Sequence, residues 1–347
     1  MEELSAKLSE YYGLNVFDSQ EVGSRSELTT DHGPYYLYNC PAAYRLKGKF
    51  IEQVEELLDK QQKVQLLPTA KTLQEEEYFL HGNKMYYVKQ GMRKHTPSNE
   101  AYLTGNALAR FHLATASYKD EKMFRSHGSF GSWPSMWRQK IRQLDDYRDQ
   151  LDDQVEDISL LDEYLLTTYT YVRQLGDTAV QYLTDAGYQR MLKGAGKYGK
   201  IAYQNFDEGY VLFDENGNPL LAGEWSWVID MRSRDIAQWI KSDVRRNGWD
   251  EGKILAFLEG YTDVSLLADE EYACMYALLL YPGRFLKLME AYKHVSAEEQ
   301  ERLEDWEEKL DGELLSMEQA LYHFPSLVSN RYGVALPTLE WSFLRFS

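Results

Sequence analysis

The chain has 347 residues, long enough for two domains with separate cores, and its 55 acidic against 38 basic residues give a formal net charge of −17. This negative charge is spread along the chain, which disfavours partners that are themselves anionic, namely nucleic acids and acidic membrane surfaces. With 44% hydrophobic residues and no apolar run near the ~20 residues that span a bilayer, we expect no insertion into a membrane.

The N-terminal part predicts a short helix followed by antiparallel strands. Leu4, Leu8 and Tyr11 repeat at helical spacing, and Gly13 ends the pattern. The same residues lack the basic flank and apolar centre of a signal peptide, so we expect synthesis in the cytoplasm. Short runs between residues 16 and 42, broken by glycine and proline, predict a small antiparallel sheet.

A helix and a hairpin complete this region. The apolar stripe of residues 49–62 predicts an amphipathic helix packed on the sheet. Residues 78–80 and 85–88 flank a turn and predict two paired strands. A polar connector over residues 91–97 follows, and we therefore predict two domains, 1–92 and 93–347.

The second domain is predicted to be mainly helical with one hairpin. Apolar residues at helical spacing predict helices over 99–118, 137–151, 234–246, 251–261, 270–280, 285–292 and 297–323. Residues 158–175 and 179–191 are predicted to form one or two more. The hairpin lies between Gly209 and Trp227, where strand-like runs flank the turn formed by residues 214–219. A small sheet with one long helix, then a helical lobe that a hairpin interrupts, is the layout of kinase-like phosphotransferases.

Three segments carry a narrower resemblance: residues 104–112 (TGNALARFH), 233–237 (SRDIA) and 280–285 (LYPGRF). Through them the chain resembles the aminoglycoside phosphotransferase and choline kinase branch of the protein-kinase-like fold. Within this branch it is similar to the YutH type of spore coat protein from endospore-forming bacteria. The resemblance implies an α+β fold of two lobes, a small antiparallel-sheet N-lobe and a larger helical C-lobe.

The resemblance also places a catalytic loop at the start of the hairpin. In this family an Asp accepts the substrate hydroxyl's proton, and an Asn five positions later holds magnesium. In the pattern His-Gly-Asp, then four residues, then Asn, Tyr203 falls at the His and Gln204 at the Gly. Asn205 falls at the catalytic Asp, and Tyr210 falls at the Asn. All four residues differ from the pattern.

The second metal ligand and the nucleotide lysine are also replaced. Counting back from Asp235, the metal-binding Asp position lands on Gly223, or on Glu224 with a one-residue slip. The strand that would carry the nucleotide lysine, residues 35–38, has no lysine, and Leu37 or Tyr38 occupies that position. The segment between Gly23 and Gly33 is not a glycine-rich phosphate cradle, because charged residues lie between the two glycines.

We therefore predict a catalytically degenerate protein with no catalytic residues, no metal and no bound cofactor. General base catalysis alone is worth about 10²- to 10⁴-fold, and a neutral Asn205 cannot supply it. The resemblance implies synthesis in the mother-cell cytoplasm and deposition in the spore coat, with other spore coat proteins as partners. We expect a scaffold whose contact surface includes the former cleft lined by Tyr203, Tyr210 and Trp225.

Two other functions remain open. The chain could be an active small-molecule or protein kinase that binds ATP and magnesium through displaced carboxylates near the hairpin, namely Asp207, Glu208, Asp214, Glu224 and Asp230. It could also be a metal-independent sensor of a small ligand. The segment 193–197 (KGAGK) resembles a phosphate-binding loop, but its glycines are too close together, which favours a connector.

Other candidate residues are interpreted as structural. His112 lies on an apolar helix face, which is typical of a packed, hydrogen-bonded histidine. Arg234 and Asp235 are predicted to form an ion pair at a helix start. Cys40 and Cys274 are far apart in sequence and suit neither a disulfide framework nor a metal site.

Overall fold

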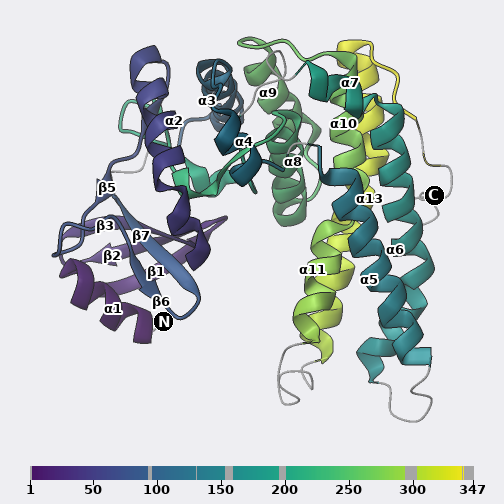
Figure 1. Ribbon diagram of the computed structural model, residues 1–347, viewed down its shortest axis with the longest axis horizontal. Coiled ribbons are helices and arrows are strands. Elements are labelled where there is room, and N and C mark those ends of the chain that lie inside the picture. The colour runs from purple at the N-terminus through teal and green to yellow at the C-terminus, as the bar shows by residue number, and fades with distance from the viewer. Residues whose placement is uncertain are drawn as a thin grey trace. The chain divides into compact units, whose positions relative to one another are not determined.

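The computed structural model describes residues 2–92, 96–129, 131–152, 159–194, 201–293, 303–337 and 339. The chain forms two compact units (Figure 1). Unit 1 comprises Met1–Gly128, Gly196–Asp235 and Gly252–Leu266, and unit 2 comprises Ser129–Ala195, Ile236–Glu251 and Leu267–Ser347. These units group the hairpin with the N-terminal sheet, so they divide the chain differently from the predicted boundary after residue 92, which stays a prediction. Most of the KGAGK segment lies outside the described residues.

Unit 1 contains the predicted antiparallel sheet. Its strands are β1 (Val16–Val22), β2 (Arg25–Thr30), β3 (Gly33–Pro41), β5 (Thr69–Ala70), β6 (Phe79–His81) and β7 (Lys84–Gln90). Their order is β1-β2-β3-β7-β5, with β6 paired to β7. Every pair is antiparallel. The hairpin predicted for residues 78–88 is β6–β7.

The two faces of this sheet carry different residues. Helix α1 (Glu2–Tyr12) packs on one face, where Leu8 and Tyr12 join a core with Leu37 and Val88. Side chains alternate along a strand, so the neighbours of Leu37 and Val88 point to the opposite face. The candidate functional site lies on that face. Helix α2 (Gly48–Gln61) follows the short helix η1 (Ala42–Lys47) and buries the apolar stripe predicted for residues 49–62.

The rest of unit 1 surrounds the predicted hairpin. It consists of α3 (Glu100–Thr115), α4 (Glu121–His127), β8 (Ile201–Tyr203), η2 (Glu208–Tyr210), β9 (Val211–Phe213), β10 (Pro219–Leu221), η3 (Glu224–Ser226), β11 (Trp227–Ile229) and α9 (Glu251–Thr262). The hairpin pairs β9 with β10, and the short β4 (Gln65–Leu66) adds to β10 in parallel. Strands β8 and β11 form a second pair, which the sequence patterns did not predict.

Unit 2 is a group of packed helices. They are α5 (Trp133–Asp152), α6 (Leu160–Asp185), α7 (Tyr188–Lys193), most of α8 (Ser233–Asn247), α10 (Asp269–Leu280), α11 (Gly283–Tyr292) and α13 (Leu303–Tyr332). Helix α6 packs against α5 and α10, and α13 packs against α10 and α11. A capping box at Ser159 and Asp162 fixes the start of α6. None of the described helices is long and apolar enough to cross a membrane.

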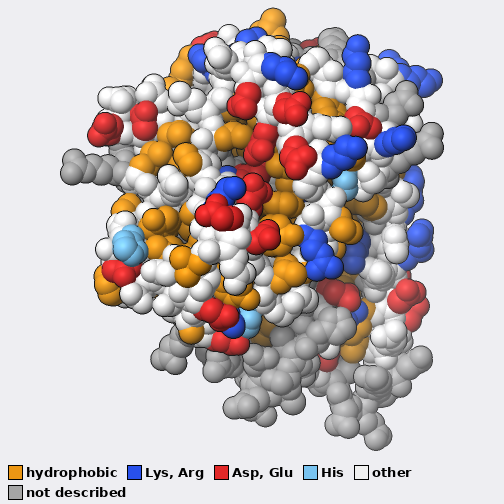
Figure 2. All heavy atoms as spheres, turned by 60° about the vertical axis from the view of Figure 1, so that its left-hand side comes forward, with side chains coloured by type: hydrophobic (Ala, Val, Ile, Leu, Met, Phe, Trp, Pro, Cys, Tyr) orange, Lys and Arg blue, Asp and Glu red, His pale blue; other side chains and the backbone are white. Residues whose placement is uncertain are grey.

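The surface carries the negative charge unevenly. Figure 2 shows acidic side chains gathered near the middle of the face that it views, with hydrophobic side chains among them. Acidic side chains are therefore not evenly distributed over this face.

Candidate functional site

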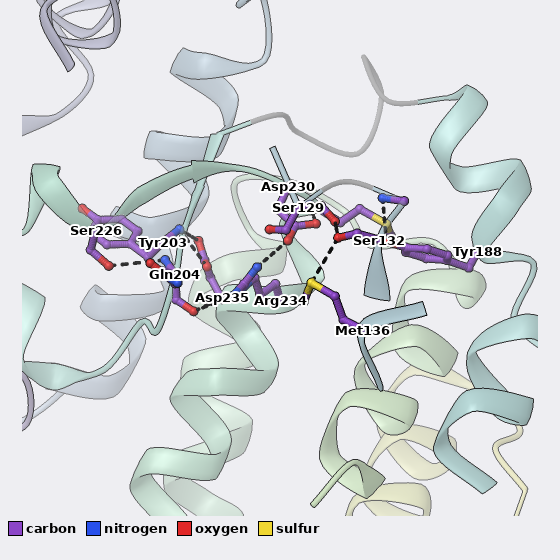
Figure 3. A network of polar contacts seen from close by, with 12 residues as sticks. Ser129, Ser132, Met136, Tyr188, Tyr203, Gln204, Ser226, Asp230, Arg234 and Asp235 are labelled. Atoms are coloured by element: carbon purple, nitrogen blue, oxygen red, sulfur yellow. Dashed lines mark hydrogen bonds and ion pairs between the residues drawn. The ribbon is translucent and has the colours of Figure 1, made fainter. Parts of the chain in front are cut away.

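The predicted catalytic loop lies in unit 1 and begins at the end of β8. Tyr203 is fully buried, and its backbone N–H donates to both carboxylate oxygens of Asp235, at 2.9 and 3.0 Å (Figure 3). Asn205, two residues later, is exposed. An exposed, neutral amide cannot remove a proton from a hydroxyl group, because it has no basic form at physiological pH.

Tyr210 belongs to a column of packed aromatic rings. The ring of Tyr38 on β3 stacks on Tyr87 of β7 at 5.3 Å and on Tyr210 at 5.9 Å between centroids. Tyr210 in turn lies 5.2 Å from the ring of Tyr203. Burial raises the pKa of Tyr210 to about 12, and it raises the pKa values of the other three hydroxyl groups well above their ordinary range. All four side chains are therefore neutral at physiological pH.

The ring of Tyr210 fills the space that a side chain at position 223 would need. Gly223 has a φ of +86°, in the left-handed region that favours glycine. A Cβ atom at this position would lie 2.1 Å from Cδ1 and 2.2 Å from Cε1 of Tyr210. No residue with a side chain, and hence no carboxylate, fits at position 223 while Tyr210 stays in place.

The turn between β1 and β2 is bonded to the start of the hairpin. Ser24 donates to the Asp207 carboxylate through its backbone N–H at 3.1 Å and through its hydroxyl at 2.6 Å. The same carboxylate accepts the Gly209 N–H at 2.7 Å. Arg25 donates to the backbone carbonyl of Glu208 at 2.7 Å, and Tyr38 donates its hydroxyl to the Gly209 carbonyl at 2.7 Å. These bonds hold the turn directly on the loop.

Glu224 is buried beside a lysine that the sequence reasoning missed. Lys89 on β7 forms an ion pair with Glu224, and the two side chains are 2% and 4% exposed. The Lys89 ammonium group also donates to the Leu67 carbonyl at 3.0 Å and to the Thr69 hydroxyl at 2.7 Å. Thr69 lies opposite Lys89 in the β5–β7 register and donates to Glu224 at 3.3 Å.

Two further ionisable groups lie close to this pair. Burial, and then the charge of Glu224, raise the pKa of Glu55 on α2 to about 7, which the nearby Lys89 partly opposes. Lys47, at the end of η1, donates to the carbonyls of Trp225 at 3.1 Å and Trp227 at 2.8 Å. Burial lowers the pKa of Lys47 to about 8, because its ammonium group leaves water for neutral acceptors.

The residues interpreted as structural are mostly confirmed. His112 is buried, and its ring nitrogens lie 2.9 Å from the Asp235 carboxylate and 2.8 Å from the Tyr261 hydroxyl. Burial holds the pKa of His112 well below its ordinary value, so the ring is neutral. The predicted ion pair of Arg234 with Asp235 is wrong. Arg234 pairs with Asp230 at 2.5 Å, one turn earlier on the chain, because Asp235 is turned inward toward His112 and the Tyr203 N–H (Figure 3).

Three of the displaced carboxylates each bind a different group of the protein. Asp207 holds the β1–β2 turn, Asp230 pairs with Arg234, and Asp214 accepts the N–H groups of Asn216 and Asn218 at 2.8 Å each within the hairpin turn. In the part of the chain that the structure describes, no three His, Cys, Asp or Glu residues are grouped so that they could hold a metal ion.

The expectation that the aromatic cleft residues form a contact surface is wrong. Tyr203, Tyr210 and Trp225 are 0%, 8% and 4% exposed. Their rings contact other rings of unit 1 and leave almost no area for another protein. The reason is tertiary, because Tyr38 of the sheet packs on Tyr210 and Tyr87 packs near Trp225. The ring of Tyr203 packs against Phe111 and Phe206.

A separate hollow in unit 2 is lined by charged side chains. It has a volume of about 680 Å³ and lies between α5 and α6. Arg173 bonds there to Asp145 at 3.0 Å and to Asp177 at 2.7 Å, and Arg148 bonds to Asp149 at 2.5 Å. Because these charges pair within the protein, the hollow is a weaker candidate for a functional site than the hairpin region.

A family model and a related protein indicate the same family. A family model described as "Spore coat putative kinase YutH" matches residues 5–324. The endospore coat-associated protein YutH of Bacillus subtilis strain 168 is 27% identical over 235 residues, which cover 67% of this chain and 65% of that relative. The match therefore spans slightly less than two thirds of the relative's length.

Solved structures show the fold. An aminoglycoside phosphotransferase from Alicyclobacillus acidocaldarius matches with a TM-score of 0.64 at 17% identity, over 92% of this chain and 93% of that one. A spectinomycin phosphotransferase, solved with ADP and spectinomycin, matches with a TM-score of 0.56 at 14% identity, over 88% and 92%. The α+β, aminoglycoside phosphotransferase-like fold predicted from the sequence is confirmed.

Proposed function

This chain belongs to the YutH family of kinase-like spore coat proteins, and we propose that it is a catalytically degenerate member whose role in the coat is structural. The observation that carries the proposal is the packing of Tyr210 over Gly223, with 2.1 Å between the Tyr210 ring and the place where a side chain at position 223 would begin. The two positions at which the family resemblance puts metal ligands thus hold a phenol ring and a hydrogen atom.

A magnesium–nucleotide complex does not fit the residues present. Magnesium is usually bound through one or two carboxylates together with substrate phosphates. Glu224, the remaining carboxylate near the ligand position, is already neutralised by Lys89. Asn205 has no charge, so no general base stands at the start of the loop, and no carboxylate ligand for the metal stands there either.

The Ser24 donors of the β1–β2 turn are not available to a phosphate. In the kinase-like fold this turn covers the nucleotide phosphates with its backbone N–H groups. Here the Ser24 N–H is bonded to the Asp207 carboxylate at 3.1 Å, and a carboxylate repels phosphate. A nucleotide would have to break these hydrogen bonds and bring its negative phosphates beside the Asp207 carboxylate. Binding here would therefore cost more free energy than binding to a turn whose N–H groups are free.

The same contacts suit a rigid architectural protein. Hydrogen bonds to a charged group contribute about 1.5–3 kcal/mol each, and buried aromatic pairs add about 0.5–1.5 kcal/mol beyond the area that they bury. Interactions of this kind hold the sheet on the hairpin without a ligand. We propose that the protein is deposited in the spore coat and that its partners are other coat proteins, in line with the coat-associated relative in Bacillus subtilis.

Thermal unfolding with and without ATP and magnesium tests the proposal. We expect no rise in the unfolding temperature that requires both ATP and the metal, and no transfer of the labelled γ-phosphate to added substrates or to the protein. A metal-dependent rise that disappears in both Glu224→Ala and Glu224→Gln would instead identify an active kinase with a displaced carboxylate. A rise with ATP alone, unchanged by chelator, would identify a metal-independent ligand sensor.

A further inference from the structure

The Lys89 ammonium group is fully occupied inside the protein. Its three N–H donors have three acceptors, which are the Leu67 carbonyl, the Thr69 hydroxyl and the Glu224 carboxylate. The side chain is 2% exposed, and the β5–β7 pairing places Thr69 directly opposite Lys89. The ammonium group is therefore held in one place by the sheet itself and has no donor left for a phosphate.

Within the described residues, one of the two Glu224 carboxylate oxygens accepts hydrogen bonds and the other does not. Its Oε1 atom accepts from Lys89 and from Thr69, while its buried Oε2 atom makes no hydrogen bond within the described residues. Among the described residues, Glu224 forms its ion pair with Lys89. A carboxylate this deeply buried is strongly destabilising unless a cation neutralises it.

Glu55 makes the need for a cation greater. It lies close enough for the charge of Glu224 to raise its pKa, an effect that the charge of Lys89 partly opposes. Glu55 is thus a second acidic group close to the Lys89–Glu224 ion pair in unit 1. Glu224 directly follows Gly223, at the end of the hairpin, where proteins of this fold keep a carboxylate for magnesium.

We propose that Lys89 is a built-in cation, and that its ammonium group replaces the divalent ion that Glu224 would otherwise bind. This inference rests on the proposed function and explains how the protein keeps a buried acidic group without a metal. It also assigns Lys89 a role different from that of a nucleotide lysine, because its charge serves Glu224 and not a phosphate group.

The inference predicts a gain of metal binding when the lysine is shortened. Lys89→Ala removes the cation that pairs with Glu224 and opens a space about the size of the lost side chain. We expect this variant to bind manganese(II), measured by isothermal titration calorimetry with MnCl₂ and no nucleotide, at least about tenfold more tightly than the wild type does. The unfolding temperature of the variant should also rise with the manganese concentration, whereas that of the wild type should not.

Two further variants serve as controls. In Lys89→Ala with Glu224→Gln, the gain should be lost, because one carboxylate oxygen is replaced by an amide nitrogen. In Lys89→Met with Glu224→Met, both charges are removed together. Such a replacement of a buried ion pair is often close to neutral in stability, so this variant should fold and ignore manganese. Its behaviour separates the loss of charge from general damage to the core.

The outcomes distinguish this inference from the proposed function. If Lys89→Ala is unfolded in metal-free buffer, recovery of its near-ultraviolet circular dichroism on addition of manganese supports the inference. If Lys89→Ala folds or fails to fold equally with and without manganese, while the wild type also ignores metal and ATP, only the built-in cation is contradicted. If the wild type itself binds manganese tightly and is stabilised further by ATP, both proposals are wrong.

Discussion

Replacing Gly223 with alanine tests whether the Tyr210 ring closes the metal-ligand position. The new Cβ would lie 2.1 Å from the ring, far inside van der Waals contact, at a φ of +86°. The left-handed conformation costs an alanine about 1–2 kcal/mol, and overpacking adds about 1–3 kcal/mol, so we expect a loss of about 2–5 kcal/mol. Gly33→Ala is the matched control, because Gly33 has a φ of +99° and nothing within 4 Å of the added atom.

A double-mutant cycle separates the two contributions. In a Tyr210→Ala background the overlap is gone, and Gly223→Ala should cost only the conformational part, about 1–2 kcal/mol. The measurements are urea unfolding followed by tryptophan fluorescence and hydrogen exchange of peptides from residues 201–229. Additivity of the two substitutions within about 0.5 kcal/mol, or equal losses for Gly223→Ala and Gly33→Ala, would refute the reasoning.

Three other predictions concern the surroundings of this position. The native pKa of Glu55, about 7, lies above the usual 4.5, so the native state holds a proton that the unfolded state has released, and stability falls as pH rises from 4.5 to 7. Glu55→Gln should flatten that decline, and equal slopes in the two proteins would contradict it. Asp207→Ala removes three hydrogen bonds to a carboxylate and should cost about 2–4 kcal/mol in urea unfolding, whereas the exposed Asp18→Ala should stay within about 0.5 kcal/mol. The His112 ring should stay neutral, so its NMR shifts should not titrate between about pH 5.5 and 8, and a midpoint in that range would contradict its burial.

Local patterns predicted most of the secondary structure. The helical spacing of apolar residues gave α2, α3 and most helices of unit 2, and the turn at Asp214 to Asn218 gave the β9–β10 hairpin. The division expected between residues 175 and 179 was wrong, because α6 continues to Asp185 and α7 begins at Tyr188. These signals are short-range, because a helix or a tight turn is set by residues a few positions apart. Strands β8 and β11 have three residues each and are too short to show a period, so they were missed.

Long-range partners could not be read in the same way. Lys89 looked like an ordinary residue at the end of a strand, although its place two positions after Tyr87 puts both side chains on the same face of β7. That alternation was the one signal that could have drawn attention to it. Likewise, Arg234 is adjacent to Asp235 in sequence, but it pairs with Asp230 in the segment between β11 and α8.

The sequence by itself determined which chemical groups stand at the positions where the family resemblance puts the catalytic residues and metal ligands. A tyrosine, an asparagine and a glycine at positions 203, 205 and 223 are facts of composition, and no folding can turn them into carboxylates or a base. Only the tertiary structure decided what fills the space: the ring of Tyr210 lies against Gly223, the Asp207 carboxylate takes the donors of the β1–β2 turn, and Lys89 neutralises Glu224. The reason is physical, since steric exclusion and charge neutralisation depend on distances of a few ångströms between residues that the chain keeps far apart.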